Sequence, residues 1–163
     1  MINLRALVFA LPVLLAASLA QGQGARVAFG TIAADPTLPV EMSADTLDVN
    51  QTDGSAEFTG DVVIGQGDMR LSAQRVKVFY NQEQGGIRTL KASGNVVLVS
   101  GQDAAESDTA DYTIETGVIV MTGNVLLTQG QNALTSQQMT INLITGTAQM
   151  TGRVKTILKT TKD

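Results

Sequence analysis

The stretch of sequence that decides the fold is Ala56-Glu57-Phe58-Thr59-Gly60-Asp61-Val62-Val63-Ile64-Gly65-Gln66-Gly67. Recognisable copies of it return at residues 90–98, 119–130 and 148–156, and in every copy a valine stands two residues after a glycine. A motif that recurs at a regular distance is typical of repeat proteins, in which each unit packs against its neighbours. The chain is therefore predicted to consist of four similar units.

A second, shorter signature precedes each glycine motif and defines the length of the repeat. Its equivalent residues are Leu47, Val76, Ala110 and Met139. The next glycine follows them after 13, 18, 13 and 13 residues, and from each of the first three glycines to the next unit the distance is 16. The period is thus 29 residues with one five-residue insertion, which falls in the polar, glycine-ended stretch 81–86, where added length costs little entropy.

Alternation of apolar and polar residues predicts that each unit is a pair of antiparallel β-strands. Around Gly60, the residues Ala56, Phe58, Val62 and Ile64 share one parity, and the other parity is mostly polar. Successive side chains of a strand point to opposite faces, so one face is apolar and must be covered by stacking of the units. A glycine in mid-strand on the apolar parity predicts a bend, bulge or corner. No helical periodicity follows residue 20, so an all-β domain is expected.

The N-terminal residues predict export. Arg5 precedes the almost wholly apolar stretch 6–19, and Ser18-Leu19-Ala20 offers the small residues that a signal peptidase needs, so residues 1–20 are predicted to be a signal peptide cleaved near Ala20. A retained membrane anchor is the alternative, although the apolar run of 14 residues is shorter than the roughly 20 that span a bilayer. We expect residues 21–39 to be a flexible lead-in, 40–158 the β-domain and 159–163 a short tail.

Composition excludes several classes of enzyme. The chain contains no histidine and no cysteine, which rules out Ser-His-Asp and Cys-His nucleophilic sites and histidine-zinc centres. Without residues 1–20, ten basic and fifteen acidic residues remain, and the net charge of −5 argues against a nucleic-acid partner. The sequence predicts no catalytic residue, no metal ligand and no cofactor, and the protein is not expected to be an enzyme.

Two charged groups have a functional and a structural interpretation. The acidic run is Asp103, Glu106, Asp108, Asp111 and Glu115. It suggests a calcium site or paired catalytic carboxylates, but its last two members fall on the outward parity, which favours a solvated surface. The second unit is basic by contrast, with Arg70, Arg75, Lys77, Arg88 and Lys91. These residues suit phosphate groups or an acidic face of another copy, and a solvated outer face is again the simpler interpretation.

The repeats resemble the OstA-like family of β-jellyroll proteins, which function in lipopolysaccharide transport. The resemblance is carried by residues 58–62 and 121–125, by Gln66-Gly67 and Gln129-Gly130, and by residues 43–49, and it covers about residues 38–158. It implies an open, twisted β-jellyroll in the periplasm whose apolar interior holds the acyl chains of lipopolysaccharide. It also implies that protomers join head to tail as a bridge between LptC-like inner-membrane and LptD-like outer-membrane jellyroll components.

The resemblance and the parity together nominate a set of inward, lipid-binding residues. Val40 and Met42 match the first strand of the family, and Tyr112 matches an inward aromatic position. In the second unit, residues 96–99 are apolar on both faces, which leaves the inward assignment there undecided. The full set is Val40, Met42, Leu47, Phe58, Val62, Ile64, Leu98, Tyr112, Ile119, Met121, Val125, Leu127, Met139, Ile141 and Met150.

Three other functions are compatible with the same residues. An exported structural β-repeat scaffold would fill its interior with these apolar side chains as an ordinary core. An inner-membrane-anchored LptC-like component would keep the N-terminal apolar segment. A carbohydrate-active enzyme would use the acidic run. The open edges of a stacked sheet further predict strand-to-strand pairing between copies, and hence oligomers whose population rises with concentration.

Overall fold

The computed structural model describes residues 25–28, 35–83 and 85–158, and within these ranges no residue is helical. The all-β prediction is therefore confirmed. The predicted signal peptide, its cleavage point and the C-terminal tail lie outside the described residues. The strands are β1 (Ala25–Ala28), β2 (Glu41–Ser43), β3 (Thr46–Asn50), β4 (Ser55–Gln66), β5 (Met69–Tyr80), β6 (Ile87–Ser100), β7 (Asp103–Thr113), β8 (Val118–Gln129), β9 (Asn132–Asn142), β10 (Thr147–Thr151) and β11 (Lys155–Ile157).

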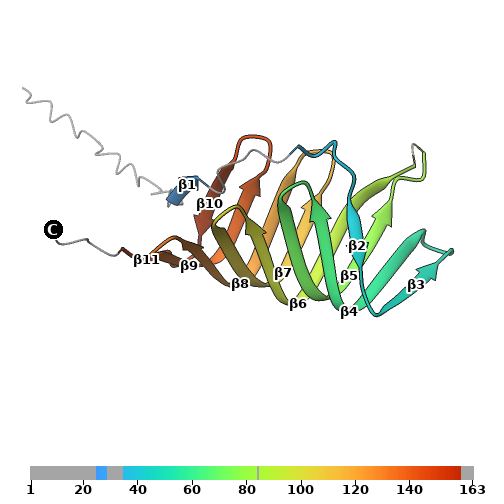
Figure 1. Ribbon diagram of the computed structural model, residues 1–163, viewed down its shortest axis with the longest axis horizontal. Helices are drawn as coiled ribbons and strands as arrows, with labels where there is room; N and C mark the ends of the chain where they lie inside the picture. Colours follow the sequence, from blue (N-terminus) through green and yellow to red (C-terminus); the bar gives the residue numbers. More distant parts are fainter. Residues whose placement is uncertain (1–24, 29–34, 84, 159–163) are drawn as a thin grey trace, which may run out of the picture.

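All eleven strands belong to one antiparallel sheet, in which β4 to β10 are neighbours in sequence order (Figure 1). The strand pairs therefore follow one another as the repeat predicted. The five-residue insertion lies in the loop between β5 and β6, where it lengthens a hairpin, and the register of the ladder shifts beside the loop, between Phe79 and Tyr80. The remaining strands complete the ends: β2 and β3 both pair with β4, and β11 pairs with β9.

Each glycine motif forms a corner, within β4, β6 and β8 for the first three and between β10 and β11 for the fourth. Gly60, Gly94, Gly123 and Gly152 have φ between 79° and 85°, and the residue after each also has a positive φ, between 42° and 49°. Next to the first corner, β4 advances three residues while β5 advances two, and the same shift returns at the next two corners. An extra residue on one strand is a β-bulge, which bends the strand and increases its twist. The predicted bend is thus confirmed.

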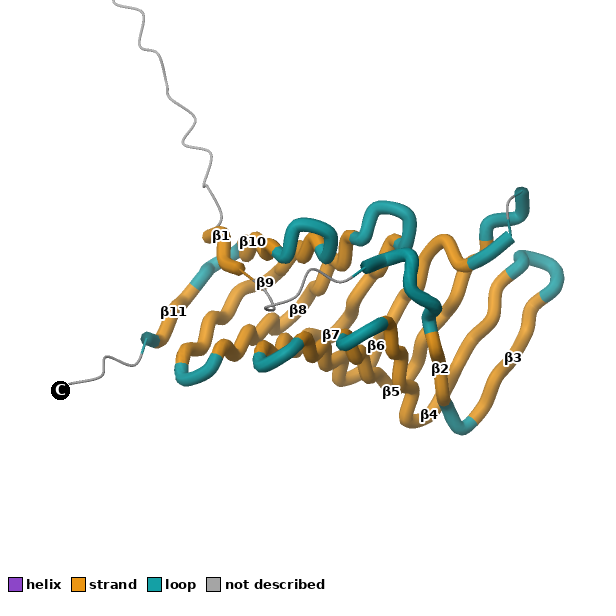
Figure 2. Tube along the Cα trace, turned by 45° about the horizontal axis from the view of Figure 1, so that its top comes forward, coloured by secondary structure: helices purple, strands orange, loops and turns teal. Residues whose placement is uncertain are grey.

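The row of corners divides the sheet into two walls. Wall 1 contains β1, β3, β10 and residues 55–59 of β4; wall 2 contains β2, β11 and residues 62–66 of β4; β5 to β9 run through both. The hydroxyl of Tyr112 in β7 donates a hydrogen bond to Oε1 of Gln66 in β4 at 2.6 Å. Three strand steps separate β4 from β7, about 14 Å along a flat sheet. The sheet is therefore folded on itself, with the walls facing each other (Figure 2).

The N-terminal strand lies at the opposite end of the sheet from β2. Residues 25–28, which fall in the predicted flexible lead-in, form β1 and pair with residues 147–150 of β10. Nε2 of Gln129 donates a hydrogen bond to the carbonyl oxygen of Ala28 at 2.6 Å. Both partners of β1 are far away in the sequence, which explains why local periodicity did not indicate this strand.

Candidate functional site

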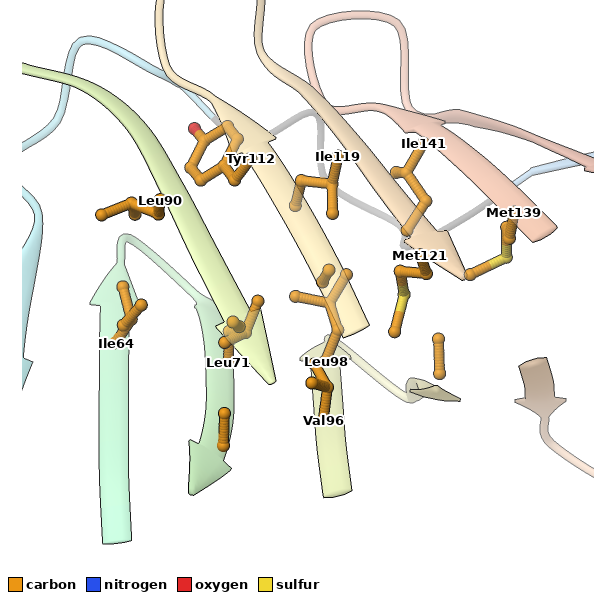
Figure 3. Packing of buried hydrophobic residues seen from close by; sticks show 14 of the residues in the cluster. Ile64, Leu71, Leu90, Val96, Leu98, Tyr112, Ile119, Met121, Met139 and Ile141 are labelled. Atoms are coloured by element: carbon orange, nitrogen blue, oxygen red, sulfur yellow. The ribbon is translucent and has the colours of Figure 1, made fainter. Parts of the chain in front are cut away.

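The space between the walls is filled by apolar side chains from every long strand (Figure 3). Eleven residues of the predicted inward set are buried there: Val62, Ile64, Leu98, Tyr112, Ile119, Met121, Val125, Leu127, Met139, Ile141 and Met150. Val40, Met42 and Phe58 are partly buried and pack against this cluster. These fourteen residues form one continuous apolar interior.

Leu47 is the exception in the predicted set. It shares the inward parity of wall 1 but its side chain is 53% exposed, and the neighbouring Val49 is 66% exposed. Both lie on β3, which pairs only with β4 and forms the end of wall 1. The prediction that Leu47 lies inside is therefore wrong, because an inward parity buries a side chain only where a further strand or the opposite wall covers it.

Several interior residues were not nominated from the sequence. Met69, Leu71, Ala105 and Leu134 are buried in the same cluster. They lie in wall 2, directly after the turns that open β5, β7 and β9. Alternation of apolar and polar residues in 69–73 was the signal that could have indicated such positions. The stretches that contain them are short, however, and lie before the second signature of each unit. The ambiguity in the second unit is also resolved: Val96 and Leu98 are fully buried, whereas Val99 is 38% exposed.

A buried polar contact joins the two walls at their open side. Tyr112 and Gln66 are each 1% exposed, and their hydrogen bond links wall 1 to wall 2. The Gln66 amide nitrogen donates to the carbonyl oxygens of Pro36 and Leu38, at 3.0 and 2.9 Å. Burial raises the pKa of the Tyr112 hydroxyl to about 12, so that the group is a protonated donor at neutral pH. Gln66 thus ties wall 1 and the segment before β2 to wall 2.

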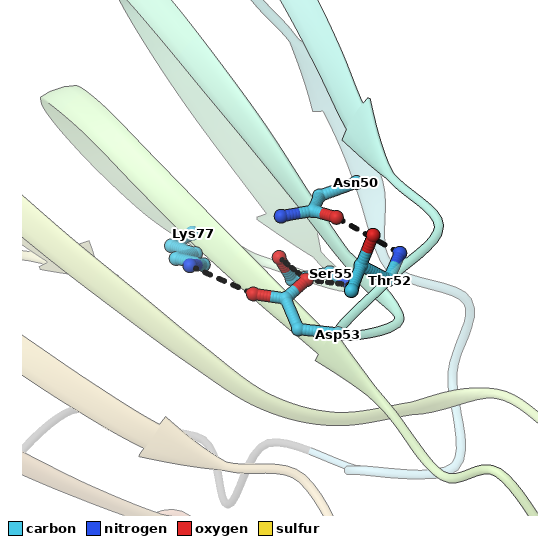
Figure 4. A network of polar contacts seen from close by, with 5 residues as sticks. All are labelled: Asn50, Thr52, Asp53, Ser55 and Lys77. Carbon is cyan, nitrogen blue, oxygen red and sulfur yellow. Dashed lines mark hydrogen bonds and ion pairs between the residues drawn. The ribbon is translucent and has the colours of Figure 1, made fainter.

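The charged residues of the basic second unit that form ion pairs lie on the outer face. Arg75 and Lys77 of the basic unit pair with Glu57 and Asp53, at 3.2 and 3.4 Å. Asp53 also accepts hydrogen bonds from the hydroxyl and the backbone N–H of Ser55, and the Ser55 hydroxyl chiefly lowers the pKa of this carboxyl (Figure 4). Exposed pairs of this kind contribute little stability, because water screens the attraction and the long side chains lose conformational freedom. They leave a mixed-charge surface rather than a concentrated basic patch.

Three members of the acidic run have separate polar partners. Asp111 pairs with Lys91 at 3.5 Å, Asp108 accepts a hydrogen bond from the side chain of Asn124 at 2.9 Å, and Asp103 accepts one from Gln129 at 3.0 Å. Among the residues that the structure describes, no three acidic side chains converge so that they could hold a metal ion. The outward, solvated interpretation of this run is favoured.

No helix in the described ranges is long and apolar enough to cross a membrane.

The sequence matches a family model over most of the β-domain. Residues 41–147 match the family described as "LptA/(LptD N-terminal domain) LPS transport protein". An uncharacterized protein of Rhizobium meliloti (strain 1021) is 28% identical over 106 residues, which are 65% of this chain and 56% of that protein. The LPS-assembly proteins LptD of Actinobacillus pleuropneumoniae serotype 5b (strain L20) and Yersinia pestis bv. Antiqua (strain Antiqua) are 40% and 38% identical over 81 and 69 residues.

These curated relatives are longer than the part that matches. The chain spans about half of the Rhizobium protein, and the matched parts cover 45% and 40% of this chain but only 10% and 9% of the two LptD proteins. The shared part of LptD is therefore a small portion of that protein.

A solved structure has the same fold. It is the crystal structure of LptH from Pseudomonas aeruginosa, described as the LptA homologous periplasmic component of the conserved lipopolysaccharide transport device. The two structures superpose with a TM-score of 0.69 at 15% sequence identity. The superposition covers 78% of this chain and 99% of that chain. At this identity the likeness shows the fold, an unclosed antiparallel β-jellyroll. The family match extends through both walls and all but the last of the glycine corners. The chain therefore belongs to the OstA-like, LptA/LptD N-terminal family of LPS transport proteins, which are non-enzymatic transport components.

Proposed function

We propose that the chain is a periplasmic lipopolysaccharide-binding bridge protein. It holds the acyl chains between its two walls, joins other copies head to tail, and passes lipopolysaccharide between LptC-like inner-membrane and LptD-like outer-membrane components. The observation that carries this proposal is the continuous apolar interior between the walls, which runs without interruption across β4 to β10 in a chain of an LPS transport family.

The dimensions and chemistry of the interior suit an acyl chain. Six strand steps separate β4 from β10, about 29 Å in total at the usual strand spacing. One leaflet of a bilayer core is about 15 Å thick, so a lipid tail of that length extends past about three strands. Each methylene that leaves water contributes about 0.8 kcal/mol to binding. Methionines 121, 139 and 150 add flexible side chains that can repack around a tail.

Loading of a tail requires the walls to separate. Ile119, Met121 and Ile141 are fully buried against other side chains in this structure, so they cannot also contact a lipid without a movement. The corners hold the walls together on one side, and the contact between Tyr112 and Gln66 holds them on the other. Separation therefore begins at the Tyr112–Gln66 side, with the glycine corners as the fixed edge.

The ends of the sheet support assembly of copies. At one end, β3 presents Leu47 and Val49 to solvent; at the other end, Ile157 and Leu158 of wall 2 are 58% and 64% exposed. Exposed apolar side chains beside unpaired strand edges favour strand addition by another chain. An end-to-end contact of unlike surfaces does not close on itself, so copies can continue into a filament.

Photo-crosslinking in living cells tests the lipid site. A crosslinking amino acid at Met121 or Ile141 is expected to capture lipopolysaccharide, because both side chains lie between the walls. The matched control is Thr140, the residue before Ile141, whose side chain points to the opposite face of β9. Failure of both inward probes, or equal capture at Thr140, would reject an interior lipid site and favour a scaffold with a permanently filled core.

The periplasmic location has its own test. Mass spectrometry of the protein purified from cells is expected to find a mature N-terminus near Gln21, as predicted for signal-peptide cleavage. A chain that keeps Met1 and fractionates with the inner membrane would instead support the anchored, LptC-like alternative.

A further inference from the structure

The two ends of wall 1 differ in how their edges are covered. At one end, no described strand pairs with the outer edge of β3, and all five of its residues are exposed. At the other end the edge of β10 is covered by β1, a strand from the N-terminal part of the same chain. Both β3 and β10 are five residues long and belong to the same wall, so they are matched in length and position for an end-to-end contact.

The contact of β1 with β10 is short and only partly apolar. Val27 lies opposite Ala148, and Ala25 lies opposite Met150. Met150 and Ala148 are buried, whereas Ala25 and Val27 are half-buried and the other two residues of β1 are exposed. Besides the strand pairing, the hydrogen bond from Gln129 to the Ala28 carbonyl holds the C-terminal end of β1.

The free strand at the other end carries larger apolar groups at the same spacing. Leu47 and Val49 stand two residues apart on one face of β3, as Ala25 and Val27 do on β1. Placed against β10, they would cover Ala148 and Met150 with more apolar area than β1 offers, and they would themselves leave water. Addition to the outer edge of β1 would instead set them beside Ala25 and Val27, which are less completely buried than Ala148 and Met150.

We propose that β1 is a placeholder on the edge of β10, and that β3 of a second copy displaces it when protomers join. This inference rests on the head-to-tail assembly proposed above and adds that the acceptor edge is closed in the free chain. A tethered strand competes at an effective concentration of the order of millimolar, whereas a second copy competes at its own concentration. The chain is then monomeric when dilute and assembles as its concentration rises, with β1 released at each new contact.

A reversible lock on β1 tests the proposal. The chain has no cysteine, so Val27→Cys with Ala148→Cys, or the adjacent opposite pair Arg26→Cys with Gln149→Cys, introduces the only disulfide. Opposite pairs alternate between close and wider spacing in an antiparallel ladder, and the pair that oxidises more completely is used. The control lock is Thr109→Cys with Thr122→Cys, which joins β7 to β8 in the middle of the sheet. A release variant, Arg26→Pro with Val27→Pro, prevents β1 from pairing.

Sedimentation over a range of concentrations gives the result. We expect the β1-locked chain to stay monomeric while its disulfide is oxidised and to assemble once the disulfide is reduced. The chain with the control lock should assemble in both the oxidised and the reduced state. The release variant is expected to assemble at a concentration at least tenfold lower than the unmodified chain. If the oxidised, β1-locked chain assembles at the same concentration as the unmodified chain, the placeholder role of β1 is overturned, while head-to-tail assembly is left intact. Monomers in every variant, including the release variant, would reject the assembly itself and the placeholder with it.

Discussion

At the scale of single residues, the repeated glycine is explained by two constraints. Its positive φ is an angle that side-chain-bearing residues rarely adopt, and the space beside it is occupied. A Cβ on Gly152 would lie 2.8 Å from atoms of Gln137, and Asp108 holds the equivalent place beside Gly123. Gln137 and Asp108 stand two residues before Met139 and Ala110, the equivalent residues of the second signature of the repeat. The two signatures recur with one period because their residues pack against each other at every corner.

Replacement of Gly123 measures these constraints. Gly123→Ala is expected to lower the free energy of unfolding by about 1–3 kcal/mol, because of the φ of 85° and the contact with Asp108. Gly130→Ala is the control: its φ is 58°, but no atom lies within 4 Å of an added Cβ. Urea unfolding should show the smaller loss for Gly130→Ala, and Asp108→Ala should reduce the cost at Gly123. Equal losses at both glycines would exclude the packing contact.

Tyr112 supplies the second prediction at this scale. Tyr112→Phe leaves the buried Oε1 of Gln66 without its donor and is expected to cost about 1–3 kcal/mol in urea unfolding. Tyr80→Phe is the control, since Tyr80 is 41% exposed, and should change stability by less than about 0.5 kcal/mol. A loss at Tyr112 no larger than at Tyr80 would show that the hydrogen bond does not hold the walls.

The same hydroxyl predicts a dependence on pH. Its pKa in the folded chain, about 12, lies above the ordinary value of 10. Its contribution to stability is therefore fully present below pH 10 and is lost as the pH rises from about 10 to about 12, where the unfolded chain releases the proton first. The unmodified protein should lose more stability over this interval than Tyr112→Phe does. Parallel pH profiles of the two proteins would contradict the assignment.

At the scale of elements, β3 is the strand whose substitution separates assembly from folding. Leu47→Lys with Val49→Lys places charges on a free edge, which opposes strand addition, and both positions are exposed in the single chain. We expect the unfolding midpoint to stay nearly unchanged and the concentration needed for assembly to rise at least about tenfold. Val99→Lys, on the outer face in the middle of the sheet, is the control and should leave sedimentation unchanged. Normal assembly of the β3 variant would exclude β3 as the joining edge.

Elements with local partners could be predicted from the sequence, and elements with distant partners could not. Strands β4 to β10 pair with their sequence neighbours, so alternation and spacing were sufficient to indicate them. β1 pairs with a strand more than 100 residues away and has only two residues on each face, too few for a periodic signal. Gln66 shares the parity of Val62 and Ile64 and is buried, although it was not nominated from the sequence. Its contact with Tyr112 depends on the folding of the two walls together, which no spacing within one strand expresses.

At the scale of the whole molecule, the fold combines a fixed side and a side that can open. The walls are connected covalently along one side, because β4 to β9 pass from one wall into the other, whereas the opposite side is joined by side-chain hydrogen bonds from Gln66 and Gln129. A few hydrogen bonds, each worth about 1 kcal/mol net, are a small barrier beside the apolar area that a lipid tail can cover. Under the proposed lipid binding, the same chain would be closed when empty and open when loaded, with little change in its strand pairing.

The 29-residue period also determines how such a molecule can grow. Strand backbones pair only with adjacent strands, so a tandem duplication of residues 94–122 should insert two strands and leave both ends unchanged. Small-angle scattering of the monomer should show a longest dimension greater by about 10 Å with the same cross-section. A collapsed or unfolded product would show that the units are not interchangeable. If they are, gene duplication and the proposed end-to-end joining are two independent ways to lengthen the same apolar interior.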